Sequence, residues 1–207
     1  MIDLYSWSTA NGRKISILLE EMNVPYNIFD VDITNDEQFE KKFSIISPSH
    51  KIPAILDKEN GKNIFESGAI MLYLASKYNQ FIPEKHYWEI MKWFFFQISQ
   101  VGPFLGQAHQ YLHYNAGKSS FAEEKSKNYV KRVYQTLENR LSESIYLGNE
   151  YSIADIATWP WIARHEWHDI GLKNYKNLTR WYLEIADREA VVKGYNFMDK
   201  EGKIPLP

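Results

Sequence analysis

Two short segments hold residue types that suit a small zwitterionic ligand. Residues 51–56 read KIPAIL, an apolar run typical of a strand, with a proline near its start. Proline has no N–H, and at the first residue of a strand this costs the sheet no hydrogen bond. If the Ile52–Pro53 bond is cis, the backbone before it turns outward, and Ile52 can offer its N–H and C=O to an extended ligand. Glu66 and Ser67 follow the next strand, where a helix begins. A carboxylate suits an ammonium group, and a hydroxyl beside helix amides suits a carboxylate, so the two segments predict a site for a peptide-like molecule.

A third segment, residues 8–12 (STANG), closes the first strand and opens the first helix. The N–H groups and positive dipole end of a helix favour an anion there. A purely structural interpretation is open as well, since Thr9, Asn11 or Ser67 can serve only as a helix N-cap. Many strands begin with proline, so Ile52–Pro53 is unspecific by itself. The order of the three segments along one α/β pattern favours the ligand site.

The elements that position these segments form a small α/β module. Residues 2–6 and 26–31 read as strands, and between them Ile15, Leu18, Leu19 and Met22 recur at helical spacing, which predicts a parallel, right-handed β-α-β unit. Residues 34–47 predict an irregular, partly helical connection. Asn60-Gly61 predicts a hairpin turn. The expected order ends with strands 54–57 and 63–65 and a helix over 67–77.

Beyond a polar link the pattern is helical. The spacing predicts helices near residues 84–100, 103–114, 121–144, 153–168 and 175–187, and an irregular tail over 200–207. Pro103 is expected to break or kink the first long helix, and Gly148 to end another. Ser152 and Asp155 form a capping box, which is more typical of a helix start than of a catalytic site.

Composition limits the classes of function. The chain has 207 residues, 44% of them hydrophobic, and a net charge of −2, so neither a nucleic-acid partner nor a membrane span is expected. Its first residues read as a strand without the basic region of a signal peptide, which predicts a cytoplasmic protein. Because the sequence has no cysteine, any thiol chemistry must use a sulfur supplied by the ligand. The histidines show no metal-ligand spacing, so no metal is expected.

Several of these pieces together resemble the cytosolic glutathione transferase family, most closely its bacterial nu class of glutathione-dependent disulfide-bond oxidoreductases. The matching pieces are MIDLY (1–5), TANG (9–12), ISP (46–48), KIPAI (51–55), FESGAI (65–70), GPFLGQ (102–107) and YSIADI (151–156). The resemblance implies an α/β thioredoxin-like domain over residues 1–78, a linker over 79–84 and an all-α domain over 85–207.

The resemblance also implies roles for individual residues. Ile52 would hold the cysteinyl backbone of glutathione, and Glu66 and Ser67 its γ-glutamyl head. Thr9 and Asn11 would lie near the sulfur and act catalytically by stabilising the thiolate.

Three further positions are implied to contact the ligand. Gln38 and Lys51 would lie toward the glycyl carboxylate. Lys125 would approach from the second domain, where the family has an arginine; lysine keeps the charge but not the planar fork. Tyr5 lies within a strand and does not match the tyrosine that other classes use.

Glutathione is therefore the expected cosubstrate. The resemblance implies disulfide reduction with two glutathione molecules or their disulfide, while conjugation to electrophiles or reduction of peroxides would use the same thiolate. A non-catalytic regulatory or binding protein with this fold remains an alternative, because fold does not fix function. The family further implies a homodimer.

Overall fold

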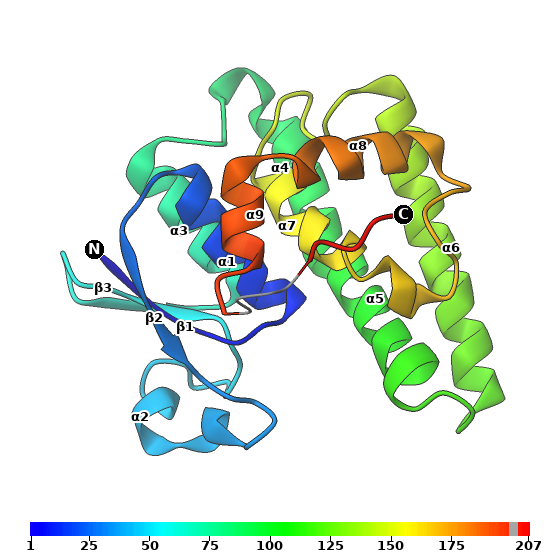
Figure 1. Cartoon of the computed structure of the whole chain (residues 1–207). Coiled ribbons are helices and arrows are strands. Elements are labelled where there is room, and N and C mark those ends of the chain that lie inside the picture. The colour runs from blue at the N-terminus through cyan, green and yellow to red at the C-terminus, as the bar shows by residue number, and fades with distance from the viewer. Residues whose placement is uncertain (199–202) are drawn as a thin grey trace. The chain divides into compact units, whose positions relative to one another are not determined.

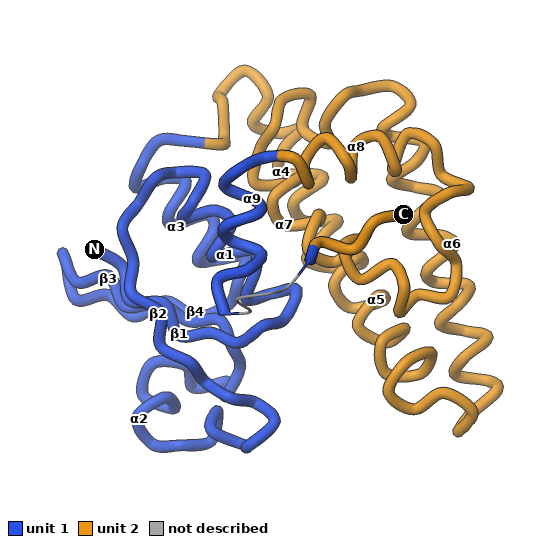
Figure 2. Tube along the Cα trace, in the orientation of Figure 1, with its two compact units in different colours: residues 1–80, 188–203 blue, residues 81–187, 204–207 orange. Residues whose placement is uncertain are grey.

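The computed structural model describes residues 1–198 and 203–207, and the chain divides into two compact units (Figure 2). The first comprises Met1–Gln80 and Arg188–Lys203, and the second Phe81–Asp187 and Ile204–Pro207. Among the described residues, no helix combines the length and the apolar character needed to cross a membrane.

The first unit is a four-stranded mixed sheet with helices (Figure 1). Its main elements are β1 (Ile2–Ser6), α1 (Ala10–Glu21), β2 (Tyr26–Asp30), β3 (Ala54–Asp57), β4 (Lys62–Phe65) and α3 (Ser67–Tyr78). The strand order is β2-β1-β3-β4; β1 and β2 are parallel, and the other pairs are antiparallel. The predicted β-α-β unit and hairpin are confirmed, and a 3-10 turn (Glu37–Phe39) with the short α2 (Lys41–Ser44) fills the expected irregular connection.

The core of this unit follows the predicted helical spacing. Ile15, Leu18 and Leu19 of α1 are fully buried, and so are Ile2 and Leu4 of β1. Alternation along the strand and the recurrence of apolar residues along the helix place both sets on facing surfaces. This packing fixes the start of α1 relative to the end of β1.

A last helix, α9 (Glu189–Tyr195), was not predicted from the sequence and packs on α1 within the first unit. Buried Arg13 donates from Nε to the carbonyl of Tyr195 (2.9 Å) and from Nη2 to Ser8 Oγ (2.8 Å). Ser16 Oγ donates to the carbonyl of Gly194 (2.6 Å). The first compact unit thus includes a segment near the C-terminus, whereas the expected domains were the continuous ranges 1–78 and 85–207. Those domain boundaries stay a prediction. Of the expected irregular tail, residues 203–207 have no helix or strand and 200–202 lie outside the described residues.

Gly194 allows α9 to pack closely on α1, because a Cβ at Gly194 would lie 2.5 Å from Ile17 Cα and 2.6 Å from Ile17 N. We expect Gly194→Ala to lower the free energy of unfolding by about 1–3 kcal/mol, since backbone must move to admit the methyl group. Urea and thermal denaturation measure the change. The control is Gly106→Ala, where the nearest atom to the new Cβ is 3.6 Å away. Equal stability of the two variants would contradict the prediction.

The second unit is helical. Its helices are α4 (Tyr87–Phe96), α5 (Gly102–Ala108), α6 (Ser120–Glu143), α7 (Ile153–Ile162) and α8 (Lys176–Ala186), with 3-10 turns at Glu84–His86 and His165–His168. The expected helix over 153–168 is therefore shorter, because the chain leaves α-helical geometry after Ile162. α6 ends at Glu143, so the prediction that Gly148 ends a helix is wrong. Gly148 instead lies in the connection to α7, where a Cβ would be 2.5 Å from Ile90 Cγ1.

Pro103 was expected to break or kink the first long helix, and the chain does not break there. A π-helical turn (Gln97–Val101) joins α4 to α5, and a second one (His109–Tyr114) follows α5, so the chain stays helical from 87 to 114. The N–H of Gly102 bonds to the carbonyl of Gln97, one residue further back than in an α-helix. This wider turn lies just before Pro103, which has no N–H. It accommodates the carbonyl group that would bond to that N–H in a regular α-helix.

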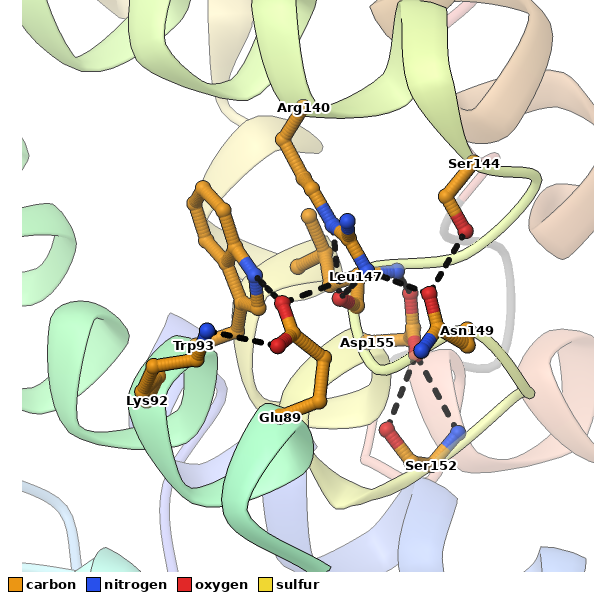
Figure 3. Close-up of polar contacts among 9 residues, drawn as sticks. All are labelled: Glu89, Lys92, Trp93, Arg140, Ser144, Leu147, Asn149, Ser152 and Asp155. Carbon is orange, nitrogen blue, oxygen red and sulfur yellow. Dashed lines mark hydrogen bonds and ion pairs between the residues drawn. The ribbon is translucent and has the colours of Figure 1, made fainter. Parts of the chain in front are cut away.

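The capping box at the start of α7 is confirmed and belongs to a buried network (Figure 3). Asp155 Oδ1 accepts from Leu147 N (2.9 Å) and Trp181 Nε1 (2.8 Å). Its Oδ2 accepts from the backbone N and the hydroxyl of Ser152, both at 3.1 Å. Burial raises the pKa of Asp155 to about 6, and the four donors keep it from rising further. Arg140 donates to the carbonyl of Leu147 through Nε (2.9 Å) and Nη2 (2.8 Å), so both backbone polar groups of Leu147 are hydrogen-bonded.

Candidate functional site

Strand register brings the three predicted segments to one edge of the sheet. Tyr5 of β1 pairs with Ala54 of β3, and Ala54 pairs with Phe65 of β4. Both pairings are antiparallel, so the end of β1, the start of β3 and the end of β4 meet at the same edge. The residues just beyond these strand ends include Thr9, Ile52 and Glu66. Their spacing in sequence gives no direct sign of this proximity.

Ile52 presents its backbone as the sequence suggested. The Ile52–Pro53 peptide bond is cis. Among the described residues, neither the N–H nor the C=O of Ile52 has a hydrogen-bond partner. Its side chain packs against the buried cluster of Val31, Phe43 and Ala54. The side chain thus fixes the segment, and the backbone groups remain available to an extended ligand.

Thr9 is the N-cap of α1: its Oγ1 accepts from the N–H of Gly12 at 3.1 Å. The structural interpretation of Thr9 is therefore correct. It is compatible with the chemical one, because the hydroxyl accepts through oxygen and keeps its own hydrogen for a second partner. Half-buried Asn11 lies in the first turn, which has no acidic residue to offset the positive end of the helix dipole. Gly12 lets this turn approach β1, since a Cβ there would be 2.2 Å from the carbonyl oxygen of Trp7.

Glu66 and Ser67 form the start of α3. Glu66 is exposed and has φ 68° and ψ 115°, a backbone conformation that costs a non-glycine residue about 1–3 kcal/mol and recurs at functional sites. Half-buried Ser67 is the first helical residue, and its Oγ accepts from Lys14 Nζ at 3.3 Å.

Sequence reasoning missed Lys14. The side chain is buried (3% exposed) in the middle of α1. Burial lowers the pKa of Lys14 to about 7, and the nearby Glu66 carboxylate partly offsets that effect. The available signal was a cationic residue three positions after Asn11, directly before the apolar part of the helix. Helical spacing places Asn11 and Lys14 on one face together with Leu18, which was predicted only as a recurring apolar position.

Gln38 and Lys51 lie in the segments that lead to this edge. Gln38 belongs to the 3-10 turn Glu37–Phe39, and its carbonyl is 3.2 Å from His50 Nδ1. Its Nε2 donates to Asp36 Oδ1 at 3.3 Å. The carbonyl of Lys51 accepts from Ser47 Oγ at 2.8 Å, and the Lys51 side chain is exposed. These contacts tie the turn to the residues before Ile52; both ligand roles stay predictions.

Family models match both parts of the chain: the glutathione S-transferase N-terminal domain over residues 1–76 and the glutathione S-transferase C-terminal domain over residues 97–189. The chain belongs to the glutathione S-transferase family. The resemblance and the two-part fold predicted from the sequence are confirmed.

Relatives within this transferase family cover nearly the whole chain. The disulfide-bond oxidoreductase YfcG of Escherichia coli is 40% identical over 198 residues, which is 92% of each chain. A glutathione transferase from Burkholderia graminis, solved with two glutathione molecules per subunit, is 36% identical (TM-score 0.89; 97% of this chain, 89% of the other). One from Pseudomonas putida, solved with one glutathione disulfide per subunit, is 34% identical (TM-score 0.88; 97% and 92%).

Lys125 and Tyr5 belong to different units. Lys125 lies on α6 in the second unit, and its Nζ is 5.8 Å from the ring centroid of Tyr129; its contact with a ligand stays a prediction. Tyr5 lies within β1 and stacks on Phe29 at 4.9 Å, and burial with the nearby Asp3 raises its pKa. No group of three or more potential metal-binding side chains occurs in residues 1–198 and 203–207.

Proposed function

We propose that this transferase-family protein binds glutathione at the sheet edge of its first unit and uses the bound thiolate to reduce disulfides. The meeting of Thr9, Ile52 and Glu66 at one edge, in a chain without cysteine, carries the proposal. Glu66 would take the ammonium of the γ-glutamyl head and Ser67 its carboxylate. Ile52 would pair with the cysteinyl backbone, which directs the sulfur toward the start of α1.

Because the protein supplies no sulfur, the exchange runs between ligand sulfurs. A glutathione thiolate attacks a substrate disulfide, forms a mixed disulfide and releases one substrate thiolate. A second glutathione attacks the glutathione sulfur of that mixed disulfide, forms glutathione disulfide and releases the other substrate thiolate. Two thiols are oxidised and one disulfide is reduced, so electrons balance without a further cofactor. The two glutathione molecules in the Burkholderia graminis relative support this stoichiometry.

The start of α1 can supply the required activation. A free thiol with a pKa near 8.5 is only about 3% thiolate at pH 7, and lowering the pKa by about two units requires roughly 2.7 kcal/mol. A helix N-terminus contributes roughly 0.3–1 kcal/mol. A hydrogen bond from the Thr9 hydroxyl or the Asn11 amide to the charged sulfur adds roughly 1.5–3 kcal/mol. The sum reaches the requirement without a general base.

Retention on immobilised glutathione, followed by turnover of a small disulfide, tests the proposal. We expect the wild-type chain to be retained and to reduce the disulfide. Glu66→Gln should lose about 10- to 100-fold in affinity, because a charge-assisted hydrogen bond becomes neutral. The matched control is Glu40→Gln, since exposed Glu40 lies in the same unit and pairs only with exposed Lys42 in the ion pairs of the described residues.

The outcomes separate the remaining alternatives. Retention without turnover of a disulfide, a chloronitrobenzene or an organic peroxide favours a non-catalytic binding protein. Turnover of chloronitrobenzene alone favours conjugation. A chain that is not retained contradicts the proposal. The family also implies a homodimer, and sedimentation equilibrium measures that state.

A further inference from the structure

The ammonium of Lys14 lies next to Ser67, the residue proposed to bind a ligand carboxylate. Its Nζ is 3.3 Å from Ser67 Oγ, and the Lys14 side chain is 3% exposed. An ammonium group donates hydrogen bonds and accepts none. When Lys14 is an ammonium, Ser67 Oγ therefore accepts from it, and the hydrogen of Ser67 must point to a different acceptor. A carboxylate at the start of α3 would be such an acceptor, because the first N–H groups of a helix have no partner within the helix and favour an anion there.

A buried cation is costly unless an anion lies close by. Glu66 is a nearby anion in the same unit, but it is exposed and proposed to pair with the ammonium of the ligand. A carboxylate bound at Ser67 would add a second negative charge near Lys14 on binding. Charge balance at this point therefore favours a ligand with an ammonium and a carboxylate on one carbon.

We infer that Lys14 is a positioning residue of the γ-glutamyl site, which orients the Ser67 hydroxyl as a donor and selects ligands with a free α-carboxylate. The inference rests on the proposed function and extends it from glutathione binding to the head group that is recognised. Lys14 acts through Ser67 and the local charge, so its effect should depend on the α-carboxylate of the ligand.

Two ligands without a thiol isolate this effect. The first is S-methylglutathione, and the second is the same molecule with 4-aminobutyrate in place of the γ-glutamyl residue, which removes only the α-carboxylate. We expect Lys14→Met to weaken binding of the first by about 10- to 100-fold, from the loss of a charge-assisted interaction. Binding of the second should be nearly equal in the wild type and the variant. Lys62→Met, at an exposed position of β4, is the control for loss of one positive charge.

Proton uptake gives a readout that a purely structural role would not change. Because the pKa of Lys14 is lowered to about 7, it is partly neutral at pH 7–8. A bound carboxylate favours the ammonium form, so S-methylglutathione should take up protons in this range. Calorimetry in two buffers with different ionisation heats measures the uptake, and Lys14→Met should abolish it. If Lys14→Met fails to fold, Lys14→Gln allows the same comparison.

Equal losses for both ligands, or no loss for either, would overturn the inference and leave the proposed function standing. A wild-type chain that binds both ligands equally well would overturn it too, since the α-carboxylate would then contribute nothing. If the wild type binds neither ligand, the proposed function fails first and the inference fails with it.

Discussion

Replacing Thr9 and Asn11 together by alanine is expected to raise the pKa of the bound glutathione thiol by about one to two units, because the hydrogen bonds to the sulfur are lost while the helix N-terminus remains. The thiolate fraction at neutral pH would fall from a majority to roughly 5–20%, and turnover would fall correspondingly. Ultraviolet titration of the protein–glutathione complex measures the pKa directly. It separates loss of activation from loss of affinity, since saturating glutathione compensates for weaker binding.

Single variants distinguish the two side chains. Thr9 also caps α1 through Gly12, so Thr9→Ala is expected to cost about 1 kcal/mol of stability as well. Thr9→Ser keeps both the cap and the hydroxyl hydrogen and is therefore the matched control. Asn11→Ala removes an amide donor without removing the cap. An unchanged thiol pKa in the double variant would exclude both side chains from thiolate stabilisation.

The largest effect on stability is expected at Asp155, which accepts four hydrogen bonds at the start of α7. Asp155→Ala should lower the free energy of unfolding by about 4 kcal/mol or more, because four buried donors lose their acceptor, at about 1–3 kcal/mol each. The affected donors belong to Leu147, Ser152 and Trp181. Urea denaturation monitored by tryptophan fluorescence measures the loss.

Graded variants test whether the network is the cause. Asp155→Asn keeps one carbonyl oxygen and the side-chain volume, so its effect should lie between those of the wild type and Asp155→Ala. Ser152→Ala removes the cap hydroxyl and should cost about 1 kcal/mol. If Asp155→Ala costs no more than Ser152→Ala, the buried carboxylate does not contribute as proposed.

The sequence alone determined the features that depend on local chemistry. Apolar spacing gave the buried face of α1, and the Ser152–Asp155 box gave the start of α7. The proline at residue 53 and the Glu66–Ser67 pair marked where strands begin and end. Together these pieces were specific enough to indicate the transferase family. Capping, turn formation and helical spacing act over a few residues, so they can be recognised without the rest of the fold.

Tertiary structure decided the features that depend on residues distant in sequence. Antiparallel register brought Thr9, Ile52 and Glu66 to one edge, and packing of α1 beside α3 buried Lys14 next to Ser67. The same holds for α9, whose Gly194 contacts Ile17, and for the π-helical turn that accommodates Pro103. Burial, the pKa of Lys14 and backbone approach are set by neighbours from other elements. Local propensity contains no information about those neighbours, and only the folded chain supplies them.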